Sequence, residues 1–551
     1  MTSGAAEERA LAESLAAAEP TTSRDLGELI ERLKAQGRLR AVHAAESQGA
    51  LGSLPIRGIS FDSRRVREGS VFVAVPGGHV DGHDYVAAAL ALGAAAAIVE
   101  RPISGVAVPQ IVVDRSQAAM AVAAAWWYGD PSHELGIVGI TGTDGKTTTS
   151  FLATAVLESA GISTGLLTTA EIKVGNLRGA NPEHVTTPEA PQLQRALRAM
   201  VDAGNQAAVV ETTSHGLALE RVGGIAYDIA IFTNLTHEHL ELHKTFEAYR
   251  DAKLSLFRRL GPAGAAGAAA KRLGRPWPPT AIVNRDDPSA SLFEAAGLSA
   301  GATLLSYGFS AEAAVRAVSV EQDARRLRVG VQTRHWSGDV ELQLAGRFNV
   351  HNALAAIALG EALELPAEAI RAGVAGLRGV PGRMERVDCG QPFGVIVDYA
   401  HSPASLQMVL DQLAPLARVG GGGLIAVFGS AGERDVQKRP MMGRIAGERC
   451  RVVVVTDEDP RGEDRQTILE EIGAGAESAG KRNGDDLLCV ADRREAIAAA
   501  FERARAGDVV VLAGKGHEQS IIMSDGPRAW DERTEAVRAL RSMGYLDEER
   551  R

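Results

Sequence analysis

The chain has 551 residues, more than one hydrophobic core usually holds, so we expect roughly two to four domains. A content of 45% hydrophobic and 23% charged residues is typical of a folded globular protein and excludes a disordered or fibrous chain. The formal net charge of -10 argues against nucleic acid as a partner, because nucleic-acid-binding proteins usually carry a clustered positive face.

The start of the chain predicts a disordered extension over residues 1–24. This segment is rich in Ala and Glu and lacks both the basic start and the apolar stretch of a signal peptide. No apolar run approaches the roughly 20 residues that a membrane span requires, so we expect no membrane insertion. Cys389, Cys450 and Cys489 are too few and too scattered for a disulfide framework, which fits a reducing compartment. We therefore expect a cytoplasmic protein.

Residues 25–134 predict a small α/β domain. An apolar run at 70–75 is followed by a Pro-Gly-Gly loop, an Ala-rich helical stretch and a second apolar run at 95–99. A helix over 116–128 follows, and the Gly-Asp-Pro-Ser sequence at 129–132 marks the end of the domain.

Residues 135–379 predict a central parallel sheet covered by helices, because short apolar runs alternate there with helical patterns. The runs lie at 135–140, 207–210, 229–232 and 281–283. The segment 261–279 is interpreted as a surface loop rather than a phosphate-binding segment, although it contains Lys271, Arg272 and Arg275.

Residues 380–551 predict a C-terminal doubly wound, Rossmann-like domain. Four buried strands are expected at 394–397, 424–428, 452–455 and 509–512, with helical segments between them. The predicted fold class is thus α/β, with three domains in series.

A glycine-rich loop follows the strand at 135–140 and opens a helix at about Thr147. In that context backbone N–H groups and a helix N-terminus can bind a triphosphate. Lys146 would neutralise the β- and γ-phosphates, and the Thr147 hydroxyl would bind Mg2+. Ile140 stands where the strict P-loop pattern has a glycine, so a tight structural turn is the alternative. The expected ATP-binding residues of the loop are Gly142, Thr143, Asp144, Gly145, Lys146, Thr147 and Thr148.

Two possible metal ligands follow the next two strands of the central domain. Glu211 and His239 come after these apolar runs, and functional sites in α/β folds form at the carboxyl ends of strands. An acidic oxygen and a neutral imidazole are reasonable metal ligands. Alone, each residue would be read as an ordinary surface residue; together, downstream of a phosphate loop, they indicate a site.

From about residue 55 to residue 545 the sequence resembles the Mur ligase family, and within it the branch of UDP-N-acetylmuramoyl-tripeptide synthetases. Several short segments carry the resemblance in a consistent order and spacing. They are 61–66, 142–149, 186–189, 211–215, 233–239, 249–253, 284–287, 348–352, 381–385, 398–403 and 514–518.

The resemblance implies a substrate, UDP-N-acetylmuramoyl-L-alanyl-D-glutamate, and residues that bind it. The uridine end would contact Phe61, Ser63, Gly78, His79 and Val80. The muramoyl dipeptide would contact Thr186, Thr187, Thr213, Leu219 and Arg221. Adenine and ribose of ATP would contact Asn284, Asn349, Arg383, Asp398 and His401.

The resemblance also implies that Lys253 is the family's carbamylated lysine. A carbamate supplies an anionic oxygen to Mg2+, which an amine cannot do. Without the resemblance, Lys253 would be read as a surface lysine that extends along its helix. The implied catalytic set is Lys146, Lys253, His239 and Glu211, with Thr147, Glu211, His239 and carbamylated Lys253 as the metal set.

The implied reaction is the ATP-dependent addition of a diamino acid through an acyl phosphate, with release of ADP and phosphate. Lys146 and Mg2+ would stabilise the charge that develops on phosphoryl and carbonyl oxygens, and domain closure would exclude water. We expect ATP, the UDP-linked dipeptide and the diamino acid as the only partners of a monomer.

The C-terminal domain is expected to select the amino acid. Family members that add meso-diaminopimelate carry Asp-Asn-Pro-Arg in a loop where this chain has Glu458-Asp459-Pro460-Arg461. Arg461 favours a distal carboxylate as a bidentate partner, whereas the extra carboxylate of Asp459 suits the ammonium of L-lysine or L-ornithine. All three amino acids therefore remain open. The implied amino-acid site is Arg434, Glu458, Asp459, Pro460, Arg461, Gly514 and Glu518.

Three other functions compete with this hypothesis. Another ligase of the superfamily, such as a folylpolyglutamate synthetase or the enzyme that adds a later dipeptide, would lack the N-terminal uridine segments and the loop at 457–461. A P-loop transport or motor ATPase would hydrolyse ATP without the UDP-linked dipeptide. A non-catalytic scaffold would not need Lys146, Glu211, His239 and Lys253 together.

Overall fold

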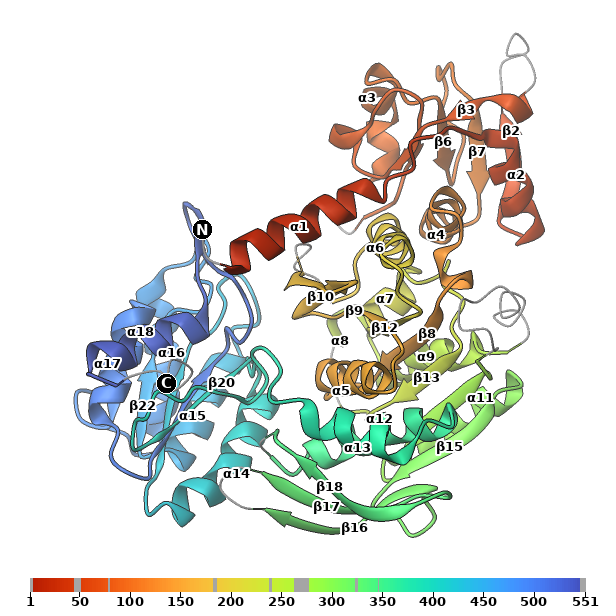
Figure 1. The fold of residues 1–551 in the computed structure, drawn as a ribbon. Coiled ribbons are helices and arrows are strands. Elements are labelled where there is room, and N and C mark those ends of the chain that lie inside the picture. Colours follow the sequence, from red (N-terminus) through yellow and green to blue (C-terminus); the bar gives the residue numbers. More distant parts are fainter. Residues whose placement is uncertain are drawn as a thin grey trace. The chain divides into compact units, whose positions relative to one another are not determined.

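The structure is a computed structural model that describes residues 3–43, 51–77, 80–181, 186–236, 240–261, 277–322, 326–344 and 346–545 (Figure 1). Its residues form two compact units. The first unit comprises Met1–Val318, Val331–Gly338 and His351–Val374, and the second comprises Ser319–Gly330, Asp339–Val350 and Ala375–Arg551. None of the described helices combines the length and the apolar character needed to cross a membrane.

A five-stranded sheet forms the N-terminal part of the first unit. Its order is β2-β7-β6-β5-β4, with β2 antiparallel to β7 and the other pairs parallel. The predicted strand–helix–strand pattern and the helix after it are thereby confirmed. The bounds are β1 Arg24–Asp25, α2 Leu26–Ala35, β2 Leu39–His43, β3 Pro55–Ile56, β4 Gly58–Ser60, β5 Ser70–Val73, α3 Val86–Ala91, β6 Ala96–Val99, β7 Gln110–Val113 and α4 Ser116–Trp127.

The N-terminal segment differs from the predicted disordered extension over residues 1–24. Helix α1 (Ser3–Ala17) packs on the central part of the first unit, where Leu11 is buried in the hydrophobic core. Farther along, the Glu19 carboxylate accepts hydrogen bonds from Trp127 Nε1 at 3.1 Å and Tyr128 Oη at 2.6 Å. These contacts hold the segment because they bury its few apolar groups and pair its charge.

The central sheet has, in the part of the chain that the structure describes, the strand order β11-β10-β9-β12-β8-β13-β14-β15-β16-β17-β18. The pairs from β9 through β12, β8, β13 and β14 to β15 are parallel, which confirms the predicted parallel core. Strands β8, β12, β13 and β14 are fully buried, because helices cover the sheet. The carboxyl ends of β8, β12 and β13 therefore lie at one edge, beside the phosphate loop.

The strands of this sheet are β8 Gly136–Thr141, β9 Thr164–Leu167, β10 Glu171–Val174, β11 Leu177–Ala180, β12 Ala207–Glu211, β13 Ile229–Phe232, β14 Thr280–Asn284, β15 Thr303–Gly308, β16 Val315–Gln322, β17 Leu327–Gln332 and β18 Ser337–Leu342. The helices between and after them are α5 Lys146–Ser159, α6 Ala190–Asp202, α7 Ser214–Ala218, α8 Leu240–His243, α9 Phe246–Arg258, α11 Ala290–Ser299, α12 Asn349–Ala362 and α13 Ala367–Gly376.

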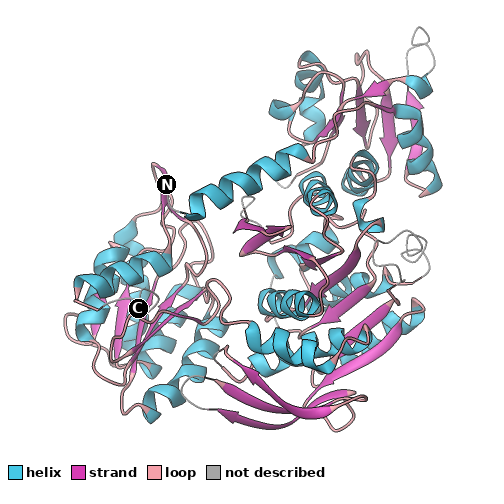
Figure 2. Ribbon diagram, in the orientation of Figure 1, coloured by secondary structure: helices cyan, strands magenta, loops and turns pink. Residues whose placement is uncertain are grey.

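The sheet of the second unit has the order β19-β20-β24-β21-β22-β23, and its strands from β20 to β23 are parallel. Alternate residues of β21 pack into two separate cores: Leu424, Ala426 and Phe428 face α14 to α16, and Ile425 and Val427 face α17 and α18. Helices thus cover both faces (Figure 2), as the prediction of a doubly wound domain requires.

The strands of this unit are β19 Glu385–Arg386, β20 Gly394–Asp398, β21 Leu424–Phe428, β22 Val452–Val455, β23 Leu487–Cys489, β24 Val509–Ala513, β25 Ser520–Met523 and β26 Gly526–Ala529. Its helices are α14 Pro403–Val419, α15 Lys438–Arg449, α16 Arg465–Ser478, α17 Arg493–Arg503 and α18 Glu532–Ser542. The four predicted strands correspond to β20, β21, β22 and β24.

Candidate functional site

The phosphate loop joins the carboxyl end of β8 to the first turn of α5. Gly142 has a φ of 153° and Gly145 a φ of 80°, backbone conformations that side chains rarely adopt. A Cβ on Gly142 would lie 1.8 Å from Thr233 Oγ1, and one on Gly145 would lie 2.3 Å from Asn352 Oδ1. Only glycine fits at these two positions, and the loop leads directly to the positive end of the α5 dipole.

The polar groups of the loop are held by neighbouring segments. The Thr143 N–H donates to Asn234 O at 2.8 Å, and the Asp144 N–H donates to Asn234 Oδ1 at 2.9 Å. Lys146 Nζ donates to Thr143 O at 2.6 Å, so its ammonium lies over the loop. The structure thus brings the predicted loop residues together into one preformed turn, with Thr148 buried in the first turn of the helix.

Glu211 lies at the end of β12, opposite Thr147. Its carboxylate is 2% exposed and accepts hydrogen bonds from Thr147 Oγ1 at 3.1 and 3.2 Å. The Thr169 N–H donates to the same carboxylate at 3.1 Å. A buried acidic oxygen beside a hydroxyl is the kind of donor set that a hard divalent cation prefers.

Lys253, on α9, extends under the phosphate loop. It is 1% exposed, and its Nζ donates to Gly142 O at 2.5 Å and lies 4.5 Å from the centroid of the Tyr249 ring. Tyr249 in turn lies 3.0 Å from Thr143 through its hydroxyl. The buried, inward position of Lys253 excludes the interpretation as a surface lysine.

The metal set is only partly described. Thr147, Glu211 and Lys253 all surround the phosphate loop, whereas His239 lies outside the described residues. Within the described residues no three His, Cys, Asp or Glu side chains gather into a group that could hold a metal. Lys271, Arg272 and Arg275 also lie outside these residues.

The residues predicted to bind the muramoyl dipeptide lie next to Glu211. Thr187 Oγ1 donates to Glu211 O at 3.1 Å and lies 3.0 Å from Thr213 Oγ1. Arg221 Nη1 donates to Thr187 O at 3.0 Å. Thr169 Oγ1 donates to Thr186 Oγ1 at 2.8 Å, and Leu219 ends the short helix α7. These five predicted residues thus lie together with the phosphate loop in the first unit.

The residues predicted to bind uridine line a separate hollow of about 530 Å³ in the N-terminal part of the first unit. Phe61, Ser63 and Val80 are among its lining residues, and Tyr85 forms another part of its wall. The Val80 side chain is 53% exposed. Gly78 and His79 lie outside the described residues.

The residues predicted to bind adenine and ribose are divided between the two units. Asn284 ends β14, and its Nδ2 donates to Thr233 O at 2.7 Å. Asn349, which belongs to the second unit, begins α12 and is buried. Also in the second unit, the Cζ atom of Arg383 lies 4.6 Å from the centroid of the Tyr399 ring. The His401 Nδ1–H donates to Tyr399 O at 2.8 Å.

Asp398 ends β20 and is buried. Its two carboxylate oxygens accept the Met384 N–H and the Ala400 N–H, each at 2.8 Å. Burial raises the pKa of Asp398, and the nearby Arg383 guanidinium opposes that rise.

The predicted amino-acid site is a cluster of loops at the carboxyl ends of β22 and β24. Glu458 lies against Gly514, whose added Cβ would be 3.5 Å from the Glu458 Cδ. The Gly432 N–H donates to Asp459 O at 2.9 Å, and Arg434 on the same loop is exposed. Pro460 and Arg461 continue the Asp459 loop, and Glu518 follows Gly514 by one turn. The structure therefore brings these predicted residues to one end of the second sheet.

Three family models match consecutive parts of the chain. The model described as "Mur ligase family, catalytic domain" matches residues 55–128, "Mur ligase middle domain" matches residues 140–360, and "Mur ligase, glutamate ligase domain" matches residues 382–516. The chain belongs to the Mur ligase family. This Mur ligase is an ATP-dependent enzyme that forms amide bonds, and the predicted architecture of three α/β domains is confirmed.

Known proteins resemble this Mur ligase over nearly its full length. The UDP-N-acetylmuramyl-tripeptide synthetase of Roseiflexus sp. (strain RS-1) is 48% identical over 495 residues, which cover 89% of this chain and 95% of the relative. The UDP-N-acetylmuramoyl-L-alanyl-D-glutamate--2,6-diaminopimelate ligase of Geobacillus kaustophilus (strain HTA426) is 40% identical over 494 residues, with coverages of 90% and 96%. A solved structure of a 2,6-diaminopimelate ligase of the same description has a TM-score of 0.62 at 30% identity and covers 95% of this chain and 100% of that chain.

Several residues of this Mur ligase's site were not predicted from the sequence. Thr169 and Asn234 contact Glu211 and the phosphate loop, and Lys515 pairs with Asp459 and Glu518. Thr169 lies 42 residues from Glu211 in the sequence, and Asn234 lies 90 residues from Asp144. Lys515 lies 56 residues from Asp459. Local patterns carry no signal for such pairs, although Asn234 and Lys515 lie inside segments that resemble the family.

Proposed function

We propose that this Mur ligase adds a diamino acid to UDP-N-acetylmuramoyl-L-alanyl-D-glutamate in the cytoplasmic synthesis of peptidoglycan precursors. The names of both relatives describe this acceptor or its tripeptide product. The observation that carries the proposal is the convergence of Lys146, Thr147, Glu211 and buried Lys253 on one glycine loop. That arrangement is suited to activating a carboxylate with ATP.

In the proposed reaction, an oxygen of the D-glutamyl carboxylate attacks the γ-phosphorus of ATP. The bond to the bridging oxygen of ADP breaks, and an acyl phosphate forms. The amine of the diamino acid then attacks the acyl carbon, phosphate leaves, and the nitrogen loses a proton. Lys146 and the N-terminus of α5 stabilise the charge on the phosphoryl oxygens in both steps.

Mg2+ fits the donor set beside the phosphate loop. The Thr147 hydroxyl and the Glu211 carboxylate are both oxygen ligands, and both are buried at this place. Thr147, Glu211, His239 and Lys253 as a carbamate would hold the ion. Bound there, Mg2+ would neutralise the charge on the β- and γ-phosphates.

The proposal also assigns the residues that bind the two nucleotides. Adenine and ribose bind Asn284, Asn349, Arg383, Asp398 and His401, and the uridine end binds the hollow beside Phe61 and Ser63. We propose domain boundaries at 25–134, 135–379 and 380–551, and a monomer. The UDP-linked dipeptide, the diamino acid and ATP are its partners.

The test is phosphate release from ATP by the full-length enzyme with Mg2+. We expect release only when both the UDP-linked dipeptide and a diamino acid are present, and stoichiometric amide formation with it. The Lys146→Met variant should lose that release. ATP hydrolysis at the same rate without the UDP-linked dipeptide would overturn the proposal in favour of a transport or motor ATPase.

A further inference from the structure

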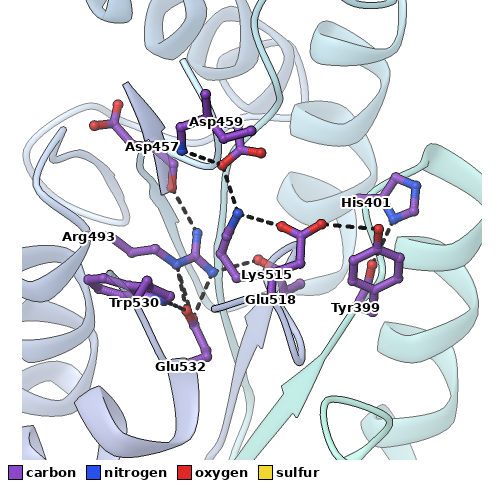
Figure 3. Close-up of polar contacts among 11 residues, drawn as sticks. Tyr399, His401, Asp457, Asp459, Arg493, Lys515, Glu518, Trp530 and Glu532 are labelled. Atoms are coloured by element: carbon purple, nitrogen blue, oxygen red, sulfur yellow. Dashed lines mark hydrogen bonds and ion pairs between the residues drawn. The ribbon is translucent and has the colours of Figure 1, made fainter. Parts of the chain in front are cut away.

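The amino-acid site contains an ion cluster around one buried lysine. Lys515 has a side chain with no exposed surface, and its Nζ donates to Asp459 Oδ1 at 2.7 Å and to Glu518 Oε2 at 2.5 Å (Figure 3). One ammonium therefore lies between two carboxylates. The three groups together carry one net negative charge.

The Oδ1 atom of Asp459 is held by groups of the protein itself. Besides Lys515, its Oδ1 accepts the Ile522 N–H at 2.9 Å, and its residue is 8% exposed. The Asp459 side chain thus orients its own loop. An asparagine at this place would leave Lys515 with a single carboxylate and the cluster without net charge, so the aspartate changes the charge of the site more than its shape.

Glu458, which precedes Asp459 on the same loop, carries a second carboxylate. It is 7% exposed, and its Oε2 is buried with no hydrogen-bond partner among the described residues. Gly514 lies beside it, because a Cβ built on Gly514 would be 3.6 Å from Oε2. A buried carboxylate oxygen without a partner is costly unless a cation binds it. This oxygen therefore points to an ammonium ligand.

Arg461 is the cation that follows on the same loop. Its backbone N–H donates to Ile522 O at 2.9 Å, and its Nε is buried without a partner within the described part of the chain. Arg434 is exposed, and none of the hydrogen bonds or ion pairs of the described residues joins its side chain to the cluster. Among the buried and half-buried groups of the site, Glu458, Asp459 and Glu518 against Lys515 and Arg461 leave one excess negative charge; exposed Arg434 is outside this count.

This charge balance separates the two classes of diamino acid. L-Lysine and L-ornithine have two ammonium groups and one carboxylate, for a net charge of +1. Meso-diaminopimelate has a second carboxylate and no net charge. That second carboxylate would have to enter a site with an excess of carboxylates, and like charges in contact are strongly unfavourable.

We propose that this enzyme selects a diamino acid with one carboxylate, of the L-lysine or L-ornithine class. Glu458 binds the distal ammonium, and the excess of carboxylates around it disfavours a second carboxylate on the ligand. The selection rests on the proposed function, because it concerns the amine of that reaction. Lys515 and Asp459 act as positioning residues that set the charge of the site.

The experiment measures kcat/KM for L-lysine, L-ornithine and meso-diaminopimelate by phosphate release, with full-length enzyme, Mg2+, ATP and the UDP-linked dipeptide. The wild-type enzyme should prefer L-lysine or L-ornithine to meso-diaminopimelate by about tenfold or more. The Asp459→Asn variant should shift this ratio toward meso-diaminopimelate by about tenfold. The Glu458→Gln variant should raise the KM for the preferred amino acid by about tenfold and leave the KM for ATP unchanged.

Glu470→Gln is the matched control, because Glu470 is exposed on α16 and loses the same charge away from the site. It should leave the preference unchanged. A wild-type preference for meso-diaminopimelate overturns the inference while leaving the proposed function intact, and the wild-type measurement decides this even if a variant does not fold. Absence of phosphate release with all three amino acids overturns the proposed function itself.

Discussion

Arg493 and Glu532 form an ion pair in which both side chains are completely buried. Arg493 Nε lies 2.9 Å from Glu532 Oε2, and the Trp530 indole N–H donates to the same oxygen at 2.6 Å. The rest of the guanidinium donates to Asp457 O at 3.0 Å and Ala513 O at 2.8 Å (Figure 3). These carbonyls immediately precede Glu458 and Gly514, so one buried arginine fixes both loops of the amino-acid site.

Replacing Arg493 should destabilise the enzyme strongly. In Arg493→Met the Glu532 carboxylate stays buried without its cation, and the loss of one partner of a buried pair costs about 3–5 kcal/mol. The measurement is the free energy of unfolding from urea titrations.

Arg494→Ala is the matched control for this prediction. Arg494 pairs with Glu535 with its side chain 55% exposed, so its loss should cost less than about 1 kcal/mol. Equal destabilisation by the two substitutions would contradict the role assigned to the buried pair.

Lys253→Ala should lose turnover by about 100-fold or more, as expected when a group that stabilises transition-state charge is removed. If Lys253 works as a carbamate, excess formate or acetate should restore part of the activity by supplying a carboxylate to the space it leaves. Phosphate release with and without added acid measures both effects.

Lys34→Ala serves as the control, because Lys34 is exposed on α2 and, within the described residues, forms an ion pair with Glu31 alone. Its activity should match that of the wild type and should not respond to formate. Undiminished turnover in Lys253→Ala would rule out the role of Lys253.

Much of the fold and of the phosphate site could be predicted from the sequence, because local patterns encode them. The apolar run before Gly142 and the helix after Lys146 specify a strand–loop–helix unit, and the structure has β8 and α5 there. The prediction from the sequence is less complete where a contact between distant residues determines the role of a side chain. Asp459 reads as a carboxylate free for a ligand, but Lys515, 56 residues later, pairs with it.

The first helix illustrates the same limit. Residues 3–17 consist largely of Ala and Glu with few large apolar side chains, so the sequence carries a weak signal for order. Burial of Leu11 in the core of the central sheet supplies the missing stabilisation. This contact depends on the position of the edge of the central sheet, and the local sequence of the helix does not encode that position.

The stability of the second unit should depend on pH through Glu463. The fully buried guanidinium of Arg439 donates to both of its oxygens, at 2.7 and 2.8 Å, and lowers the pKa of Glu463 from 4.5 to about 2. Because the folded pKa lies below the unfolded one, this stabilisation is complete above pH 4.5 and is lost as the pH falls toward 2.

Glu463→Gln should therefore be less stable than the wild type by about 1–3 kcal/mol at pH 7, with the gap narrowing below pH 4.5. Urea unfolding at pH 7 and pH 3.5 measures the gap. A gap that stays constant between these values would show that the ionised carboxylate is not the source of the stabilisation.

Gly142→Ala should abolish nucleotide binding, whereas Gly161→Ala should not, although both glycines have positive φ. At Gly142 the new Cβ would lie 1.8 Å from Thr233 Oγ1 and 3.0 Å from the Asn234 backbone, so the phosphate loop must move. At Gly161 no atom of the residues that the structure describes lies within 4 Å of the new Cβ, and the cost is backbone strain of about 1–2 kcal/mol. Two measurements separate the effects. Thermal unfolding should change in both variants, whereas titration calorimetry with ADP and Mg2+ should show a loss of affinity only in Gly142→Ala. Retained ADP affinity in Gly142→Ala would mean that the observed turn does not form the nucleotide site.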